Sequence, residues 1–286
     1  MMRLRSLLFA PGDSPRKIDK ALASEADAVI LDLEDAVAPV AKEGARAAVV
    51  ALLPGLSRPG VIVRVNPEET KWHVEDLAAV VPGRPAAVLL PKCNGPEALL
   101  RLDQRLDTAE AAFGLAPRTI GVIALVTESA ASVHSLGRFG PGLPRLLALS
   151  FGAEDLSADL GIRPRLAGGG FPQPIGIARG LMLIAAAAAG VPAIDTPFPD
   201  PRDPVGFATE AASAAEDGFC GKYLIHPDQI APAHAAFTPS PDRLRWARAV
   251  AELFAANPGA GVLTLDGQMI DRPHHRLALR ILAAAG

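Results

Sequence analysis

Eight short apolar runs recur along the chain, and polar residues or a turn-forming pair follow each of them. Between the runs lie stretches that are long enough for a helix and its turns. A strand that is repeated eight times with an intervening helix is typical of a (β/α)8 TIM barrel. The sequence therefore predicts an α/β barrel, with strands in the apolar runs at residues 4–10, 28–33, 61–65, 86–90, 120–126, 146–151, 191–194 and 223–225.

The residues that directly follow the runs show where chemistry is expected. In a barrel of this kind the reactive groups lie at the carboxyl ends of the strands. Glu128 and Asp155 are the most informative of these residues. The residues that follow the eight runs, in chain order, are Pro11-Gly12, Glu34-Asp35, Asn66-Pro67, Pro91-Lys92, Glu128, Glu154-Asp155, Asp195 and His226-Pro227.

Glu128 and Asp155 follow consecutive predicted strands, so their carboxylates can converge although 27 residues separate them. Two carboxylates without a neighbouring histidine or cysteine are hard oxygen ligands. Mg²⁺ takes one or two such ligands and completes its shell with water and substrate oxygens. The position alone also fits two rim acids that form salt bridges with arginines.

Arg64 ends the third predicted strand, and the alternation of the strand points its side chain into the barrel mouth. A guanidinium there offers a planar fork to a carboxylate or to a developing oxyanion. It could equally neutralise the acids that close the second strand, Asp32, Glu34 and Asp35. We expect one of these three acids to point inward, and the sequence does not decide which.

Other polar positions give weaker signals. Lys92 and His226 are single rim groups, and such residues are more often satisfied polar side chains than catalysts. Ser129 and Ser150 lack the Gly-x-Ser-x-Gly pattern of a nucleophile elbow. Gly168–Gly170 lacks the Lys-Ser/Thr and the helix start of a phosphate loop. The sequence therefore argues against a covalent hydrolase and against an NTPase.

The bulk properties limit the class of protein. The net charge of −3 over 286 residues and the scattered arginines give no basic surface for nucleic acid. The apolar stretch 181–189 is about half of a membrane span. Cys93 and Cys220 form no metal-binding or disulfide pattern, so we expect buried thiols. We therefore expect a cytoplasmic protein that binds neither nucleic acid nor membrane.

The chain divides into a predicted barrel, residues 1–235, and a C-terminal extension, residues 236–286. Ser240 and Pro241 predict the start of a helix that runs to residue 256. We expect an irregular segment at 259–273 and a final helix at 276–285. The glycine- and proline-rich stretch 164–174 fits a mobile loop over the site or a plain connection.

Several motifs together resemble those of the HpcH/HpaI aldolase and citrate lyase beta-subunit superfamily, in its stand-alone CoA-ester lyase branch. The resemblance covers nearly the whole chain, and the number and order of the motifs make a chance match very improbable. The motifs are Arg5-Ser-Leu-Leu-Phe9-Ala-Pro-Gly12, Leu31-Asp-Leu-Glu-Asp-Ala-Val37, Arg64-Val-Asn-Pro67, Leu90-Pro-Lys92, Glu128-Ser-Ala130, Phe151-Gly-Ala-Glu-Asp-Leu156, Gly218-Phe-Cys-Gly-Lys222, Ile225-His-Pro227 and Asp266-Gly-Gln-Met-Ile-Asp271.

This resemblance implies a TIM barrel that holds Mg²⁺ on Glu128 and Asp155, with Arg64 on the substrate oxygens. It implies that the CoA moiety contacts residues near the first strand and the following helices, which here are Phe9, Arg16 and Arg46. It further implies that Asp271 is the catalytic acid or base and reaches the active site of an adjacent subunit. We therefore expect a homo-oligomer, a trimer or hexamer, whose extension covers a neighbouring active site.

The reaction implied is a Claisen cleavage, or its reverse, of a 3-hydroxyacyl-CoA such as malyl-CoA, citramalyl-CoA or citryl-CoA. Three alternatives remain: a class II aldolase that works without CoA, a citrate lyase beta subunit that acts on an acyl-carrier-protein thioester, and a non-catalytic subunit. The segment 266–271 favours the thioester reading over the aldolase. Ser129 replaces the family's usual threonine, and we expect little consequence because the hydroxyl is kept.

Overall fold

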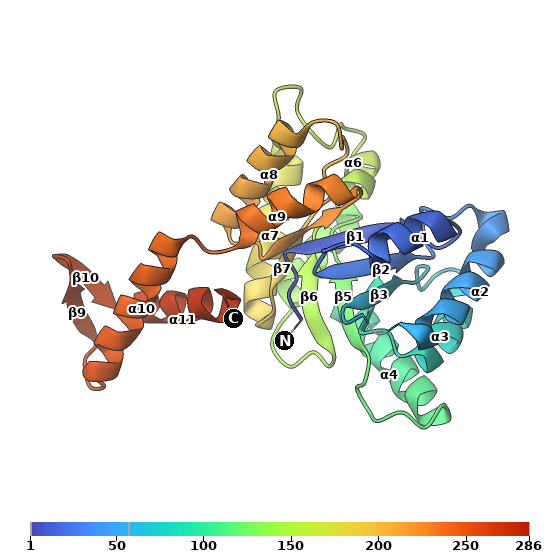
Figure 1. Cartoon of the computed structure of the whole chain (residues 1–286), viewed down its shortest axis with the longest axis horizontal. Helices are drawn as coiled ribbons and strands as arrows, with labels where there is room; N and C mark the ends of the chain where they lie inside the picture. The colour runs from blue at the N-terminus through green and yellow to red at the C-terminus, as the bar shows by residue number, and fades with distance from the viewer. Residues whose placement is uncertain (1, 57, 286) are drawn as a thin grey trace. The chain divides into compact units, whose positions relative to one another are not determined.

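The computed structural model describes residues 2–56 and 58–285. Its main feature is a closed barrel of eight parallel strands, with β8 pairing with β1 to close the sheet (Figure 1). The predicted (β/α)8 barrel is therefore confirmed. The strands are β1 Ser6–Pro11, β2 Ala28–Asp32, β3 Val61–Arg64, β4 Ala87–Leu90, β5 Gly121–Leu125, β6 Leu146–Ser150, β7 Ala193–Asp195 and β8 Gly221–Leu224.

Helices alternate with the strands around the outside of the barrel, and Figure 1 shows α2, α3 and α4 together on one side. Proline stands in the first turn of α1, α4, α7 and α8, where its missing N–H costs no hydrogen bond. None of the helices in the described residues is both long and apolar enough to traverse a bilayer. The helices are α1 Pro15–Leu22, α2 Lys42–Leu52, α3 Trp72–Val80, α4 Pro96–Ala112, α5 Ala130–Ser135, α6 Glu154–Asp159, α7 Gln173–Ala189, α8 Pro204–Asp217 and α9 Ile230–Phe237.

Alternate residues of the strands fill the barrel interior. Ile30 of β2 and Ile62 of β3 belong to this buried core. Because side chains alternate along a strand, the next inward positions are Asp32 and Arg64. These two residues are also paired in the β2–β3 register. The strand pattern itself therefore carries a carboxylate and a guanidinium to the same point of the barrel mouth.

The eighth strand begins at Gly221, two residues earlier than predicted. The prediction missed its start because the charged Lys222 interrupts the apolar run in the sequence. The Lys222 side chain is fully buried, and its Nζ donates to Asp195 Oδ2 at 2.7 Å and to Glu210 Oε1 at 2.8 Å. These contacts place Asp195 on the outer side of the barrel wall, facing the helices. Asp195 follows an apolar run as Asp155 does, yet it belongs to the packing of β7 and β8 against α7 and α8.

The chain forms a second compact unit, residues 235–286, after the first unit of residues 1–234. It contains α10 Pro241–Ala256, α11 Arg272–Ala285 and, between them, a hairpin of β9 Val262–Leu265 and β10 Gln268–Asp271. The prediction of an irregular segment at 259–273 was therefore wrong. Asp266 and Gly267 adopt positive φ values of 46° and 80°, and Asp-Gly is a strongly preferred pair for such a two-residue turn.

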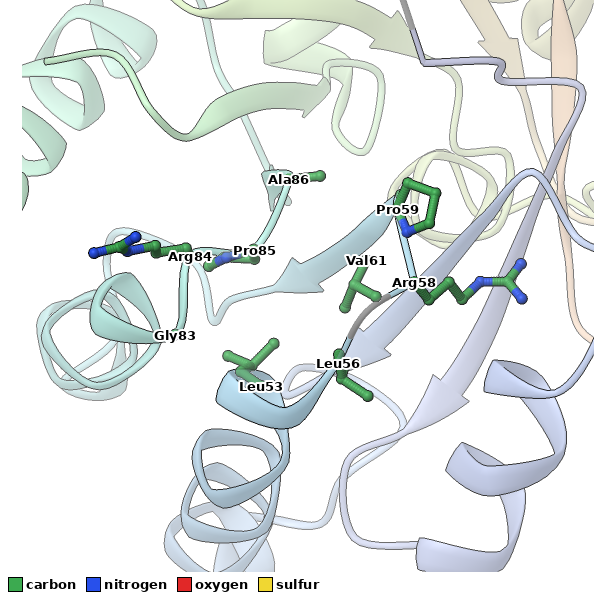
Figure 2. A pocket seen from close by; sticks show the side chains of 10 residues that line it. Leu53, Leu56, Arg58, Pro59, Val61, Gly83, Arg84, Pro85 and Ala86 are labelled. Atoms are coloured by element: carbon green, nitrogen blue, oxygen red, sulfur yellow. The ribbon is translucent and has the colours of Figure 1, made fainter. Parts of the chain in front are cut away.

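The hollow shown in Figure 2, of about 170 Å³, lies at the amino-terminal ends of β3 and β4. It is lined by residues that precede or begin these strands: Leu53, Leu56, Arg58, Pro59, Gly60, Val61, Gly83, Arg84, Pro85 and Ala86. In a TIM barrel this end serves stability, whereas the carboxyl ends of the strands carry the chemistry. The functional site is therefore expected at the opposite end of the strands.

Candidate active site

Arg64 lies at the centre of the barrel mouth and forms a two-point ion pair with Asp32. Its Nε donates to Asp32 Oδ1 at 2.7 Å, and its Nη2 donates to Asp32 Oδ2 at 2.6 Å. The backbone N–H groups of Glu34 and Ala36 also donate to Asp32 and fix its orientation. Burial alone would lower the pKa of the Arg64 guanidinium. The charge and hydrogen bonds of Asp32 have the larger effect, so the pKa lies above its ordinary value. Arg64 is therefore a permanent, well-oriented cation.

Aromatic side chains support Arg64 from inside the barrel. The guanidinium lies 4.8 Å from the centre of the Phe9 ring, and Phe9 lies 5.2 Å from the ring of Tyr223. The Tyr223 hydroxyl donates to Ser150 Oγ at 2.8 Å, which anchors this ring to β6. Packing of this kind restricts the guanidinium to one plane, so the orientation of the fork is set before any ligand arrives.

Glu34 continues the site from Arg64 toward the metal-binding candidates. Its Oε2 lies 3.0 Å from Arg64 Nη1, and Lys92 Nζ donates to its Oε1 at 2.6 Å. Burial raises the pKa of Glu34, although Arg64 and Lys92 both oppose that rise. Asp35, in contrast, has a side chain that is 57% exposed. Among the three acids that close β2, Asp32 and Glu34 are therefore the ones built into the site.

Lys92 is a central residue that the sequence presented only as a single rim group. Its φ of 51° is unusual for a side chain with a Cβ. This conformation directs its backbone N–H to Glu128 Oε2, while its Nζ reaches Glu34 and lies 3.7 Å from Asp155 Oδ1. Lys92 thus contacts Glu128, Asp155 and Glu34, and Glu34 in turn pairs with Arg64.

Glu128 and Asp155 come together at this end of the barrel. Glu128 follows β5 and is 5% exposed, whereas Asp155 lies in the first turn of α6 with its side chain 39% exposed. Burial, together with the nearby charges of Glu34 and Asp155, raises the pKa of Glu128 to about 8. Such a shift marks a carboxylate that lacks a matching positive charge.

The charges of the whole cluster fit a divalent cation. When all groups are ionised, the acids exceed the bases by two charges. The cluster comprises the acids Asp32, Glu34, Asp35, Glu128 and Asp155 and the bases Arg64, Lys42 and Lys92. Within the described residues, no three His, Cys, Asp or Glu side chains form a metal site by themselves. A metal on Glu128 and Asp155 would therefore take its other ligands from water or substrate, as Mg²⁺ commonly does.

Gly152 has no side chain, and the Glu128 side chain packs against its backbone where a Cβ would otherwise lie. A Cβ added at Gly152 would lie 3.1 Å from Glu128 Cγ and 3.1 Å from Leu125 Cδ2. We predict that Gly152→Ala displaces the Glu128 carboxylate by a few tenths of an ångström and weakens Mg²⁺ binding about tenfold, because ligand positions tolerate only ~0.5 Å. Calorimetric titration checks this, with Gly168→Ala, where a Cβ meets nothing within 4 Å, as the control. Equal affinity in both variants would contradict the prediction.

Asp271 belongs to the second unit, at the end of β10 and directly before α11. Its Oδ1 lies 2.6 Å from His274 Nδ1 and accepts the backbone N–H of His274 at 3.4 Å. The side chain therefore caps α11. Within the described part of the chain its Oδ2 makes no hydrogen bond to another residue, so the cap uses only one of the two carboxylate oxygens.

The HpcH/HpaI aldolase/citrate lyase family profile matches residues 5–227, which include all of β1 to β8 and the cluster around Arg64 and Glu128. The chain belongs to this family. The resemblance inferred from the motifs is therefore confirmed.

Relatives within the family align over nearly the whole chain. The citrate lyase subunit beta of Escherichia coli is 35% identical, over 98% of this chain and 93% of its own length. The mitochondrial citramalyl-CoA lyase of Rattus norvegicus is 32% identical, over 98% and 86%. The solved structure of CitE from Mycobacterium tuberculosis, in complex with magnesium, acetoacetate and coenzyme A, is 33% identical with a TM-score of 0.77, covering 99% of this chain and 98% of that one.

Ser129, the residue after Glu128, acts as the N-cap of α5. Its Oγ accepts the backbone N–H of Ser132 at 3.1 Å. We predict that Ser129→Thr is nearly neutral, whereas Ser129→Ala lowers the free energy of unfolding by about 1 kcal/mol through loss of the cap. Chemical denaturation of the two variants measures the difference, and equal stabilities would contradict it.

The family's expected CoA contacts lie on three different elements. Phe9 is on β1 beneath Arg64, Arg16 is exposed on α1, and Arg46 is on α2. Arg46 donates to Asp76 Oδ1 at 2.7 Å and pairs with Glu75 at 2.9 Å. Within the described residues no hydrogen bond or ion pair joins the three, so their shared role stays a prediction.

Cys93, Cys220 and His226 fill structural roles. Cys93 is buried and Cys220 partly buried, both thiols are free, and burial raises the pKa of each to about 12. Such thiols are protonated and unreactive at neutral pH. His226 accepts the backbone N–H of Asp228 on its Nδ1 and so caps the turn after β8.

The stretch 164–174 is held at its base. Arg165 Nε donates to Glu210 at 2.9 Å, and its guanidinium lies 5.3 Å from the Phe171 ring. Phe171 in turn packs edge-on against Phe151, at the end of β6. The glycines between these anchors are exposed. Closure of this stretch over the site stays a prediction, as does its alternative, a plain connection.

Proposed function

We propose that this protein is a Mg²⁺-dependent carbon–carbon lyase that cleaves a 3-hydroxyacyl-CoA thioester, of the malyl-, citramalyl- or citryl-CoA type, to acetyl-CoA and a 2-oxo acid. One observation carries the proposal. The carboxylates of Glu128 and Asp155 and the fork of Arg64 lie on one barrel rim and are joined through Glu34 and Lys92. Two carboxylates that can hold one Mg²⁺ suit the 2-oxo acid half of such a substrate. The fixed guanidinium beside them suits the thioester half, on which the negative charge develops.

The relatives support this substrate class. One is named a citramalyl-CoA lyase and another a citrate lyase beta subunit, and the Mycobacterium tuberculosis structure contains magnesium, acetoacetate and coenzyme A. At about one-third identity they support CoA-ester chemistry and leave the acyl group open. In our proposal Phe9, Arg16 and Arg46 bind the CoA moiety.

Each residue has a defined part in the cleavage. Asp271 accepts the proton of the 3-hydroxyl group, the C–C bond breaks, and the electron pair passes to the thioester as an enolate. Arg64 stabilises the negative charge that develops on the enolate oxygen. The protonated Asp271 then returns the proton to the enolate carbon, which gives acetyl-CoA and restores the carboxylate. Glu128 and Asp155 would hold Mg²⁺, which would supply Lewis acidity and a template for the 2-oxo acid half.

The substrate assay tests this proposal against its alternatives. Purified protein is incubated with malyl-CoA, citramalyl-CoA, citryl-CoA, a citryl thioester of an acyl-carrier protein, or a free 4-hydroxy-2-oxo acid, with Mg²⁺ or with EDTA. Mg²⁺-dependent release of acetyl-CoA from one of the thioesters supports the proposal. Turnover of the free acid alone would make the protein a class II aldolase, activity only on a carrier-protein thioester would make it a citrate lyase beta subunit, and no turnover would favour a non-catalytic subunit.

We further propose a homo-oligomer, a trimer or hexamer, in which Asp271 serves a neighbouring active site. The prediction is that inactive Asp271→Asn and inactive Glu128→Gln proteins regain activity when their subunits exchange. In a mixed oligomer, some active sites receive intact Glu128 and Asp155 from one chain and an intact Asp271 from the neighbouring chain. Activity after exchange is the measurement, and mass spectrometry of differently tagged subunits verifies the exchange. Complete exchange without any activity would place Asp271 in its own chain's site or outside the reaction.

A further inference from the structure

His274 makes a close contact with the carboxylate of Asp271. The His274 Nδ1 lies 2.6 Å from Asp271 Oδ1, and the two side chains are 39% and 31% exposed. The backbone N–H of His274 donates to the same oxygen at 3.4 Å. Oδ1 therefore has two contacts with one residue, whereas Oδ2 has no hydrogen bond to another of the described residues.

The position of the proton on His274 follows from two competing contacts. Nδ1 also lies 3.3 Å from the backbone nitrogen of Asp271, whose N–H it could accept. One ring nitrogen cannot accept a hydrogen bond there and at the same time donate one to the carboxylate. At 2.6 Å from a carboxylate oxygen, an unprotonated nitrogen would set two lone pairs against each other. The shorter contact therefore places the proton on Nδ1.

We propose that His274 is a positioning residue for Asp271, and that its Nδ1–H holds Oδ1 so that Oδ2 is the oxygen that accepts the substrate proton. This inference rests on the proposed function, in which Asp271 is the proton acceptor. The arrangement separates two tasks within one carboxylate. Oδ1 fixes the side chain on the first turn of α11, and Oδ2 remains free for the reaction.

No other charged side chain of the described second unit forms an ion pair with Asp271. Arg272 donates to the carbonyl of Pro258 and lies 5.5 Å from the Phe254 ring. His275 stacks on the same ring at 4.6 Å. The remaining charged residues of the hairpin and of the two helices are Asp242, Arg243, Arg245, Arg248, Glu252, Asp266, Arg276 and Arg280. The hydrogen bond from His274 lowers the pKa of Asp271, which keeps the carboxylate ready to accept a proton.

The test compares His274→Ala and His274→Gln with His275→Ala, a neighbouring control that leaves Asp271 untouched. Glutamine at this position retains a capping box, so it separates loss of the cap from loss of the imidazole. We expect His274→Ala to lower kcat roughly tenfold with little change in KM, because general-base catalysis contributes about 10² to 10⁴ in total. The acid limb of the pH profile should move to higher pH, since Asp271 loses the partner that lowers its pKa.

Two further measurements keep the inference falsifiable. In an Asp271→Asn background, His274→Ala should cause no additional loss of kcat, because His274 acts only through Asp271. Carbon NMR titration of the Asp271 carboxyl group should show a higher pKa in His274→Ala than in the wild type. Additive losses in the double variant, or an unchanged carboxyl pKa, would overturn the inference. So would equal losses in His275→Ala.

The NMR titration also separates this inference from the proposed function. It reports on the carboxylate whether or not the protein turns over a thioester. If the wild type cleaves no thioester, the proposed function fails, and an unchanged carboxyl pKa would then refute the contact with His274 as well. If Asp271→Asn retains full activity, the positioning role is refuted even where the carboxyl pKa shifts.

Discussion

Replacement of Glu128 by glutamine should abolish measurable Mg²⁺ binding and thioester cleavage while the barrel stays folded. Glutamine keeps the shape of the side chain and can still accept the N–H of Lys92, but it removes one of the two carboxylates that we propose as Mg²⁺ ligands. Asp155→Asn should have the same effect. We expect affinity to fall by more than the roughly 10- to 100-fold that outer-shell substitutions cost. Activity should fall by on the order of 10³ or more, since Lewis-acid stabilisation supplies several kcal/mol.

Isothermal titration of the purified variants with MgCl₂ is the direct measurement, and thermal unfolding checks the fold. Glu154→Gln is the matched control, because Glu154 precedes Asp155 on α6 and has its carboxylate on Arg165, at 2.9 Å. Wild-type affinity in Glu128→Gln and in Asp155→Asn would remove the pair from the metal site. Loss of affinity in the control alone would move the site to Glu154.

Arg64→Lys should lose about 100- to 1000-fold in kcat although it retains the positive charge. An ammonium cannot reproduce the two parallel contacts with Asp32 and still face the substrate, and loss of one donor to an oxyanion costs about this much. Because Asp32 and Glu34 are buried, the variant should also be less stable, by up to about 3–5 kcal/mol if one acid loses its partner.

Steady-state kinetics and denaturant unfolding together separate the two effects. Arg101→Lys is a suitable control, since Arg101 forms a similar two-point pair with Glu68, at 2.9 and 2.7 Å, on the surface. Added guanidinium should restore part of the activity of Arg64→Ala. A Lys variant within a few-fold of wild type in kcat/KM would show that the planar fork plays no part in the reaction.

The barrel could be predicted because its signal repeats. Each strand is a short apolar run, buried on both faces by helices and by the interior, and such runs stand out in a sequence. Prediction from apolar runs fails where a charged residue is buried within a strand. Lys222 interrupts the last run with a charge, and only its three-dimensional partners Asp195 and Glu210 make that charge compatible with a buried strand.

The hairpin in the second unit escaped prediction for a different reason. Its strands have four residues each, and the exposed positions Val262 and Met269 blur the alternation. The turn pair Asp266-Gly267 was a usable signal for a hairpin. Short strands outside the main sheet obtain their stability from packing on α10 and α11, and local sequence does not reveal that packing.

For the site, the sequence could indicate Arg64, Glu128 and Asp155 as candidates, because Arg64 ends a strand and the two acids follow strands within a few residues, on the side of the barrel where chemistry is expected. It could not indicate how they are joined. The link depends on the positive φ of Lys92 and on the burial of Glu34, and both arise from tertiary contacts. Lysine carries no local preference for that backbone conformation, so no pattern in the chain announces it.

Charges alternate in sign along the row Asp32, Arg64, Glu34, Lys92 and Asp155. This alternation limits how the site can evolve. Exchange of any one member leaves its neighbours with an unmatched charge, so accepted changes in this row should come as pairs. New substrate preferences are more readily acquired where no such row exists, as in the exposed glycines of 168–170. Across the family, the rim should therefore vary in linked pairs while that stretch varies residue by residue.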